Sequence, residues 1–350
     1  MKKKIVAVLL TAVMAMGLAA CGSGTDAGAD ANTDDAKVYK VGIIQFVDDA
    51  SLNQIEKNIE TELDKKGKEL GVTFDYADYT FNGQADATTL NQITTQLISD
   101  EVDVIIPIAT PTAQIVQAAT EDNPIPVVFS AVSDPVGASL VASMDAPGSN
   151  ITGTSDALNT NTIMDMIFAA DPDADYIGLL YSKSEDASKQ AIADAKAYLD
   201  AKGVAYIEKT GTTTDEVSSA ADALVAEGVD AIFTPTDNTI MTAELAIYEK
   251  LTDAKIPHYT GADSFALNGA FLGYGVDYAN LGVETADMVV EILVDGKNPA
   301  EMAVKTFDNG LATINTQTCA AIGYDLETVK AVLADYCTQI SEIETAEEFE

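Results

Sequence analysis

The stretch Glu101-Val102-Asp103-Val104-Ile105-Ile106 decides the fold, because the chain repeats its pattern as Gly228-Val229-Asp230-Ala231-Ile232-Phe233 roughly 130 residues later. A short, continuous apolar run of this kind is typical of a strand buried on both faces of a parallel sheet. Two further pairs of runs recur in the same order, at residues 39–46 and 176–181, and at 125–129 and 256–260. The repeat predicts two similar lobes, each built on its own sheet.

Helical segments separate the strand-like runs. In the first copy, amphipathic patterns cover residues 51–68, 85–99 and 113–120. Alternation of apolar strands with such helices predicts an α/β fold, in which helices cover both faces of a parallel sheet. We therefore expect two doubly wound parallel-sheet lobes whose strands point their carboxyl ends at a common cleft.

The loops that follow the strands are rich in hydroxyl and carboxyl groups. In open α/β sheets, ligands bind at the edge where these loops lie. The loops are residues 48–51, 110–114 and 130–135 in the first copy and residues 182–184, 234–239 and 261–264 in the second. We expect the binding site among them.

Thr110-Pro111-Thr112 has the pattern of a helix start, with Thr110 as the capping residue and Pro111 at the first helical position. The N–H groups that follow carry the positive end of the helix dipole, so they can bind a carboxylate, with the hydroxyl of Thr110 or Thr112 as a further donor. For this motif alone, a purely structural capping role for Thr110 is the better explanation, but hydroxyl-rich strand ends at residues 110–112, 130–133 and 234–239 share one edge and favour a site.

Asp237 and Asp263 follow strands of the second copy. A buried carboxylate needs a cation or several hydrogen-bond donors, so either residue can receive a ligand ammonium group. The alternative is that each caps the helix that follows it. An amino acid would match the hydroxyl-rich loops and the acidic loops together, whereas a sugar would need further polar groups and an aromatic platform.

The composition excludes several classes of function. The 350 residues include 56 acidic residues and 19 basic residues, which gives a net charge of −37. Every basic residue is a Lys. Such a chain gains nothing from counterion release, so we expect no nucleic-acid partner. One His and three Cys leave little material for a metal site, and we expect no metal and no cofactor.

Catalytic motifs are also missing from the sequence. His258 lies within a predicted strand, where a structural role is favoured. No Gly-rich phosphate loop opens a helix, and no Ser sits in a GxSxG turn. We therefore expect no catalytic residues and no enzyme activity.

The N-terminus has the pattern of an export signal. Basic residues precede an apolar run over residues 5–16, and Leu18-Ala19-Ala20-Cys21 resembles the bacterial lipobox. We expect a signal peptide over residues 1–20, lipidation of Cys21, and a flexible tether over residues 21–37. The protein is then expected at the outer face of the cell membrane, attached by a lipid anchor.

Near the C-terminus, Cys319 and Cys337 either pair or stay free, depending on the redox state of the habitat. The acidic residues 341–350 are expected to be a frayed helix end.

Four motifs carry a resemblance to a known family. They are residues 41–45, 109–114, 132–138 and 151–156. Together with the lipobox and the repeated lobes, they make residues 38 to 335 similar to the ABC-transporter substrate-binding lipoproteins of the type I periplasmic-binding fold, in particular the tryptophan or aromatic amino-acid subfamily. The resemblance implies capture of a small solute by two closing lobes and its delivery to a membrane permease and a cytoplasmic ATPase.

The resemblance also implies site residues and lobe boundaries. Ligand contacts are expected at Asp49, Thr110, Thr112, Gln114, Ser133, Asp156, Tyr181, Thr236, Asp237 and Asp263. Lobe 1 would comprise residues 38–152 and 279–305, lobe 2 residues 153–278 and 306–337, and an acidic tail residues 338–350, with a hinge of several crossing strands between the lobes.

The ligand remains open at this stage. The family commonly has His-Pro-Ala-Leu-Asp where this chain has Asp49-Ala50-Ser51-Leu52-Asn53, which changes the chemistry of one loop. An amino acid, perhaps aromatic, is the leading hypothesis. A nucleoside or sugar binder on the same fold, and a secreted enzyme or surface adhesin, are the alternatives.

Overall fold

The computed structural model describes residues 37–346 and 348–349, which belong to one compact unit. The expected signal peptide, Cys21 and the tether as far as residue 36 lie outside the described residues. Within these residues the chain forms two seven-stranded sheets and eleven α-helices. The expected α/β class with two doubly wound sheets is therefore confirmed.

Lobe 1 is the name used here for the first sheet and the helices on it. Its strands run in the order β12-β6-β5-β4-β1-β2, with β3 also paired to β1, and every pair is parallel. The strands are β1 (Val38–Gln45), β2 (Thr73–Asp75), β3 (Thr80–Asn82), β4 (Val104–Ile108), β5 (Val127–Phe129), β6 (Ile151–Ser155) and β12 (Lys305–Thr306). The helices are α1 (Ala50–Leu70), α2 (Ala87–Ser99), α3 (Thr110–Thr120) and α9 (Tyr278–Leu293), with a 3₁₀ turn at Pro299–Glu301.

Lobe 2 is the second sheet with its helices. The strand order is β14-β13-β11-β10-β9-β7-β8, and only β11 and β13 pair antiparallel. The strands are β7 (Tyr176–Tyr181), β8 (Ala205–Thr210), β9 (Ala231–Thr234), β10 (His258–Thr260), β11 (Leu272–Gly275), β13 (Leu311–Asn315) and β14 (Gln339–Ile343). The helices are α4 (Thr160–Ala170), α5 (Asp186–Lys202), α6 (Thr214–Glu227), α7 (Asn238–Asp253), α8 (Asp263–Leu267), α10 (Thr316–Ile322) and α11 (Leu326–Leu333).

The expectation of a frayed helix at the C-terminus is wrong. Residues Gln339–Ile343 form β14, which pairs in parallel register with β13 from Leu311 to Asn315. Pairing with β13 satisfies the backbone N–H and C=O groups on one side of this short, half-exposed edge segment, which its own sequence does not favour strongly as a strand.

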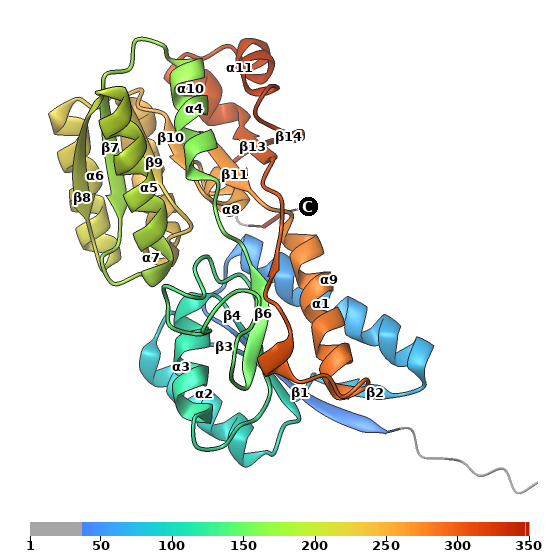
Figure 1. Ribbon diagram of the computed structural model, residues 1–350. Coiled ribbons are helices and arrows are strands. Elements are labelled where there is room, and N and C mark those ends of the chain that lie inside the picture. The colour runs from blue at the N-terminus through green and yellow to red at the C-terminus, as the bar shows by residue number, and fades with distance from the viewer. Residues whose placement is uncertain (1–36, 347, 350) are drawn as a thin grey trace, which may run out of the picture. The chain divides into compact units, whose positions relative to one another are not determined.

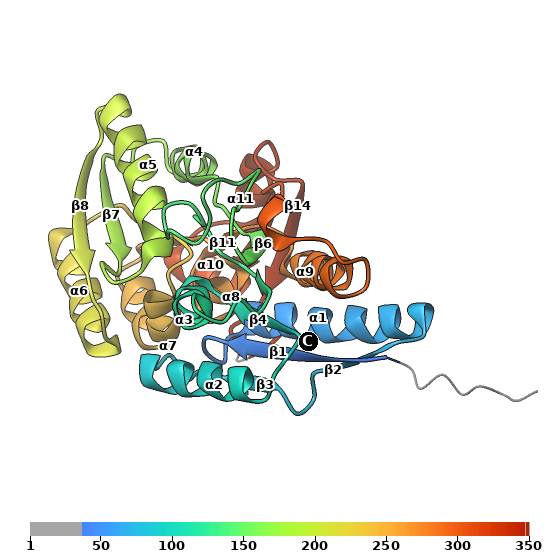
Figure 2. The same cartoon turned by 60° about the horizontal axis from the view of Figure 1, so that its bottom comes forward.

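The long helix α1 and helix α9 lie side by side in lobe 1, as Figures 1 and 2 both show. α1 begins after Asp49, whose carboxylate accepts hydrogen bonds from the N–H groups of Ser51 and Leu52, and ends at Gly71 in the left-handed conformation. In α9, Gly282 packs so closely on α1 that a Cβ there would lie 2.5 Å from the carbonyl oxygen of Ile55. The two helices thus make backbone contact.

Three connections join the sheets. They are the segments between β6 and α4, between β11 and α9, and between β12 and β13. Asn309 in the third connection ties it to the first: its Oδ1 accepts from the N–H of Asn159 at 2.9 Å, and its Nδ2 donates to the carbonyl oxygen of Ala157 at 2.8 Å. The first and third connections are therefore hydrogen-bonded to each other.

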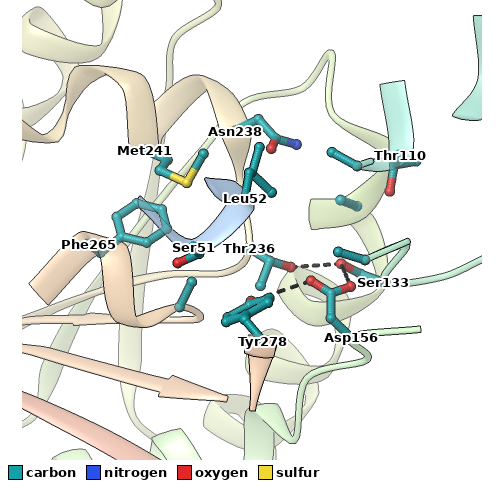
Figure 3. A pocket seen from close by; sticks show the side chains of 14 residues that line it. Ser51, Leu52, Thr110, Ser133, Asp156, Thr236, Asn238, Met241, Phe265 and Tyr278 are labelled. Carbon is teal, nitrogen blue, oxygen red and sulfur yellow. Dashed lines mark hydrogen bonds between the residues drawn. The ribbon is translucent and has the colours of Figure 1, made fainter. Parts of the chain in front are cut away.

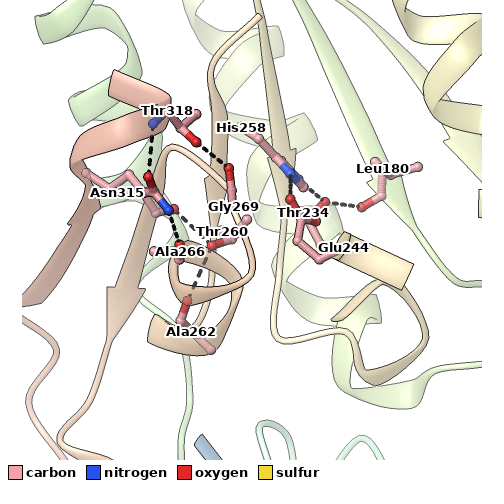
Figure 4. Close-up of polar contacts among 11 residues, drawn as sticks. Leu180, Thr234, Glu244, His258, Thr260, Ala262, Ala266, Gly269, Asn315 and Thr318 are labelled. Carbon is pink, nitrogen blue, oxygen red and sulfur yellow. Dashed lines mark hydrogen bonds and ion pairs between the residues drawn. The ribbon is translucent and has the colours of Figure 1, made fainter. Parts of the chain in front are cut away.

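His258 has a structural position inside lobe 2 (Figure 4). Its Nε2 lies 2.8 Å from Thr234 Oγ1, which in turn donates to the carbonyl oxygen of Leu180 at 2.9 Å. Because the Thr234 hydroxyl proton is used in that bond, His258 Nε2 must be the donor to Thr234. His258 Nδ1 lies 3.1 Å from the buried carboxylate of Glu244, so the imidazole links β9, β10 and α7.

Both described cysteines are free. Cys319 is buried in α10, and its Sγ lies 3.8 Å from the carbonyl oxygen of Tyr324. Cys337 is partly buried, with Sγ 3.9 Å from Met166 Sδ. The structure therefore shows Cys319 and Cys337 unpaired and not joined by a disulfide.

Candidate binding site

A cavity of about 30 Å³ lies where the loops of the two lobes meet, and Figure 3 shows the side chains around it. Lobe 1 contributes Leu52, Thr110 and Ser133, and lobe 2 contributes Thr236, Met241 and Phe265. A more open hollow of about 360 Å³ adjoins it and shares Ser133, Ala187 and Thr236 with it. The hydroxyl groups of Ser133 and Thr236, 2.8 Å apart, lie on the boundary between the two spaces.

The start of α3 differs from the expectation. Thr110 is not the cap: Ala109 occupies that position with φ 78° and offers no side-chain hydrogen bond, and Pro111 follows within the first turn. The hydroxyls of Thr110 and Thr112 are buried and have no hydrogen-bond partner in the structure. Thr110 lines the cavity, whereas Thr112 does not.

Two strained residues border the same cavity. Ala109 has φ 78° and Ala131 has φ 54°, in the region of positive φ that residues other than Gly rarely adopt. Each costs of order 1–3 kcal/mol, and such strain concentrates at ligand sites. The backbone at Ala109 and Ala131 turns sharply after β4 and β5 and so places Thr110 and Ser133 at the cavity.

Asp156, in the first connection between the sheets, contacts two hydroxyl groups of lobe 1. Ser133 Oγ donates to Asp156 Oδ1 at 2.9 Å, and the hydroxyl of Tyr278 lies 3.5 Å from Asp156 Oδ2 (Figure 3). Burial raises the pKa of Asp156 to about 6, although the hydrogen bonds from Ser133 and Tyr278 oppose that rise. The structure thus brings together four predicted residues, namely Thr110, Ser133, Asp156 and Thr236.

Asp263 bridges the lobes beside the cavity. It accepts a hydrogen bond from Ser51 Oγ at 2.5 Å and another from Gln54 Nε2 at 3.1 Å, both from α1. Asp263 lies in the first turn of α8, whose capping residue is Ala262, so the capping alternative for Asp263 is wrong. Asp49 caps α1 instead of lining the cavity, and burial raises its pKa to about 7.

The remaining predicted residues lie away from the cavity. Asp237 caps α7, which is the structural role that the sequence offered as the alternative to ligand binding. It also accepts hydrogen bonds from the N–H of Ser182 and the hydroxyl of Ser188. The Tyr181 hydroxyl donates to Glu208 at 2.6 Å beside a different surface hollow. Gln114 donates to Asp186 at 2.7 Å, which makes a further direct contact between the lobes.

Sequence reasoning missed several cavity residues. Leu52, Met241 and Tyr278 have the spacing of ordinary buried helix residues, so no local signal separated them from the core. Tyr278 had one usable cue, because it begins a helix directly after the second connection between the sheets.

Membrane-spanning helices and metal-binding clusters are both absent from residues 37–346 and 348–349. No helix there is long and apolar enough to span a bilayer. No group of three or more His, Cys, Asp or Glu side chains in the same part of the chain is arranged to hold a metal ion.

The fold and the inter-lobe cavity define a solute-binding protein, and comparisons with known proteins agree. A family model described as ABC transporter substrate binding protein matches residues 40–335. The chain belongs to this family, which consists of binding proteins and not of enzymes. Proteins of the family work outside the cytoplasm.

Three relatives are informative. A tyrosine-binding protein of Clostridioides difficile (strain R20291) is 32% identical over 326 residues, covering 91% of this chain and 92% of that protein. The structure of an ABC domain with L-Trp from Streptococcus pneumonia has a TM-score of 0.79 and 31% identity, covering 87% of this chain and 100% of the other. The ligand-free, open structure of a substrate-binding protein with adhesive properties from Clostridium difficile has a TM-score of 0.66 and 31% identity. The match covers 88% of this chain and 100% of the other.

Proposed function

We propose that this protein captures an α-amino acid, with aromatic amino acids as the leading candidates, for an ABC importer. The observation that carries the proposal is the unpartnered hydroxyl of Thr110, buried at the start of α3 and lining the same cavity as the carboxylate of Asp156. A zwitterion offers a carboxylate for the hydroxyl of Thr110 and an ammonium group for the carboxylate of Asp156. Phe265, Met241 and Leu52 supply apolar surface for a side chain.

The carboxylate of the ligand would lie at the start of α3. The N–H groups of the first turn and the hydroxyl of Thr110 are donors without acceptors of their own, and the helix dipole favours a negative charge there. The chain has no Arg, so this helix end takes the place of a guanidinium group.

The lobes would move apart to admit the ligand. A cavity of about 30 Å³ holds an occupant no larger than water, well below what an amino acid needs. The contacts Ser51–Asp263, Gln114–Asp186 and Ser133–Thr236 hold the lobes together here. The higher TM-score to the complex with L-Trp than to the open structure, at equal identity, supports a closed arrangement.

Membrane attachment and transporter partners are part of the same proposal. The lipobox supports cleavage before Cys21 and a lipid anchor that holds the protein at the outer face of the cell membrane. An ABC permease and its ATPase would receive the ligand. Intact mass of the membrane-extracted protein tests the anchor: an unmodified Cys21 on a secreted chain would refute it.

The ligand class is tested by thermal unfolding of the protein with L-tyrosine, L-tryptophan, L-phenylalanine, nucleosides and sugars. A ligand present at 100 times its Kd stabilises the native state by about 2.7 kcal/mol. We expect at least one aromatic amino acid to raise Tm and its D-enantiomer to have little effect. A shift with nucleosides or sugars and none with the amino acids would overturn the proposal in favour of the other solute class.

A further inference from the structure

Two pairs of carboxylates near the meeting of the lobes differ in one respect. Glu185 and Asp237 face each other, and both belong to lobe 2. Asp49 and Asp263 also face each other, but they belong to different lobes. Asp49 precedes α1 of lobe 1, and Asp263 begins α8 of lobe 2. Movement of the lobes would leave the first pair intact, whereas it would separate Asp49 from Asp263.

Ser51 joins the two carboxylates of the pair that spans the lobes. Its N–H donates to Asp49 Oδ1 at 2.9 Å, and its hydroxyl donates to Asp263 Oδ1 at 2.5 Å. The hydroxyl oxygen also accepts from the N–H of Ser264 at 3.1 Å, so the single hydroxyl proton is directed to Asp263. Asp49 and Asp263 are therefore held on the two sides of one residue when the lobes are together.

The Asp49–Asp263 pair has no counter-charge. Asp49 is 8% exposed, and no Lys forms an ion pair with Asp49 or Asp263 among the described residues. The other titratable groups nearby are the exposed Asp48 in the same loop, Tyr278 from α9 and, beyond the Tyr278 hydroxyl, Asp156 from the first connection. None of them supplies a positive charge. Two ionised carboxylates at this place would repel each other out of water, which opposes closure.

On these grounds, and resting on the proposed function, we propose that capture of the ligand is coupled to the uptake of one proton. When the lobes close, a proton from the solvent binds to a carboxylate oxygen of the Asp49–Asp263 pair, which loses one of its two negative charges. When the lobes open, both carboxylates return to water, the O–H bond breaks and the proton is released. Closure is therefore favoured at low pH and opposed at high pH.

The pKa shifts of the two carboxyl groups agree with this direction. Burial raises the pKa of Asp49 to about 7, and the charge of Asp263 adds to the rise. Burial also raises the pKa of Asp263. Since an Asp in water has a pKa of about 3.9, the extra ligand affinity is fully present below that value and is lost as pH rises through about 7. Asp156 acts in the opposite direction, because its ionised form is the one that a ligand ammonium requires.

Isothermal titration calorimetry with L-tyrosine at pH 6 counts the protons. The binding enthalpy is measured in buffers of different ionisation enthalpy, and its slope against that enthalpy gives the number of protons taken up per ligand. We expect about 0.5 to 1 proton for the wild type, because the pair is largely ionised in water and largely protonated in the closed arrangement at this pH. A smaller uptake would overturn the proposal.

Asp49→Asn is the decisive variant, because Asn also caps helices and so keeps the start of α1 while removing the charge. It should at least halve the proton uptake and bind L-tyrosine more tightly than the wild type at pH 8, where the ionised pair opposes closure. Asp86→Asn is the matched control, since Asp86 caps α2 from an exposed position. Asp194→Asn removes a charge beside the outer hollow, where Asp194 accepts a hydrogen bond from Gln190. Both controls should keep the wild-type uptake.

The opposite result for Asp49→Asn would contradict the coupling: an uptake close to that of the wild type, or weaker binding at every pH, would show that Asp49 is only a cap. A further measurement needs no variant. The wild type should bind L-tyrosine about tenfold more weakly at pH 8 than at pH 6, because one group with a pKa of about 7 loses its proton. Equal or tighter binding at pH 8 would also contradict the coupling. If the wild type binds no aromatic amino acid at either pH, the proposed function itself fails.

Discussion

At the scale of single residues, removal of the unpartnered Thr110 hydroxyl should change ligand affinity and the free energy of unfolding in opposite directions. Thr110→Val keeps the shape and removes a buried group without a partner, so the ligand-free protein should be as stable as the wild type or gain up to about 2 kcal/mol. Ligand affinity should fall several-fold, because a donor to the carboxylate is lost. Chemical denaturation and titration with L-tyrosine measure the two effects.

Thr94→Val is the matched control, because the Thr94 hydroxyl is equally buried but donates to the carbonyl oxygen of Leu90 at 2.8 Å. It should leave the ligand affinity unchanged. A Thr110→Val variant that loses stability and binds normally would show that the hydroxyl is only structural.

The buried carboxylates predict a pH dependence of stability. Burial raises the pKa of Asp156 to about 6 and that of Asp49 to about 7, above the values of the unfolded chain. The native state therefore binds more protons, and its stability should fall as pH rises from about 4 to about 7. For Asp156 the shift corresponds to at most about 3 kcal/mol.

Thermal unfolding of the ligand-free protein between pH 4 and pH 8 measures this dependence. Asp156→Asn should flatten the curve, whereas Asp194→Asn should leave its slope unchanged. Identical slopes in the wild type and Asp156→Asn would mean that Asp156 is not desolvated as the structure indicates.

At the scale of elements, the backbone contact of α1 with α9 depends on Gly282. Gly282→Ala should destabilise lobe 1 by about 1–3 kcal/mol, because the added Cβ would lie 2.5 Å from the carbonyl oxygen of Ile55 and the helices must separate. The sign is informative, since Gly→Ala within an open helix stabilises by roughly 0.5–1 kcal/mol. Urea unfolding measures the change, and a stabilised variant would contradict the close packing.

Elements also show how far local patterns extend. The fully buried strand β4 could be predicted from residues 104–108, because a short continuous apolar run that ends before a Thr-Pro helix start is typical of a covered strand. Strand β14 could not, because it exists through pairing with β13, a segment that precedes it by more than twenty residues. The start of α3 was misplaced by one residue, since the strained φ of Ala109 leaves no trace in the sequence.

At the scale of the whole molecule, direct contacts between lobes should contribute to ligand affinity. Gln114 on α3 donates to Asp186 of lobe 2, whereas Gln117 on the same helix donates only within lobe 1, to the carbonyl oxygens of Ser139 and Leu140. Gln114→Ala should raise the Kd of L-tyrosine by about three- to tenfold, mainly through faster dissociation.

Gln117→Ala provides the comparison, since it removes the same kind of side chain without loosening the closed arrangement. Stopped-flow or surface-based kinetics would measure both variants. Equal Kd values for Gln114→Ala and the wild type would show that this contact adds nothing to closure.

The sequence by itself determined the α/β class, the repeated lobes, the acidic charge and the absence of Arg, because these follow from composition and short-range periodicity. It also located the loops of the site. Which carboxylate is available to a ligand was decided only by the tertiary structure. Asp237 and Asp156 both follow strands, but the partners of Asp237 come from residues 182 and 188, and those of Asp156 from residues 133 and 278. Acceptor capacity depends on these distant partners, and no local pattern encodes them.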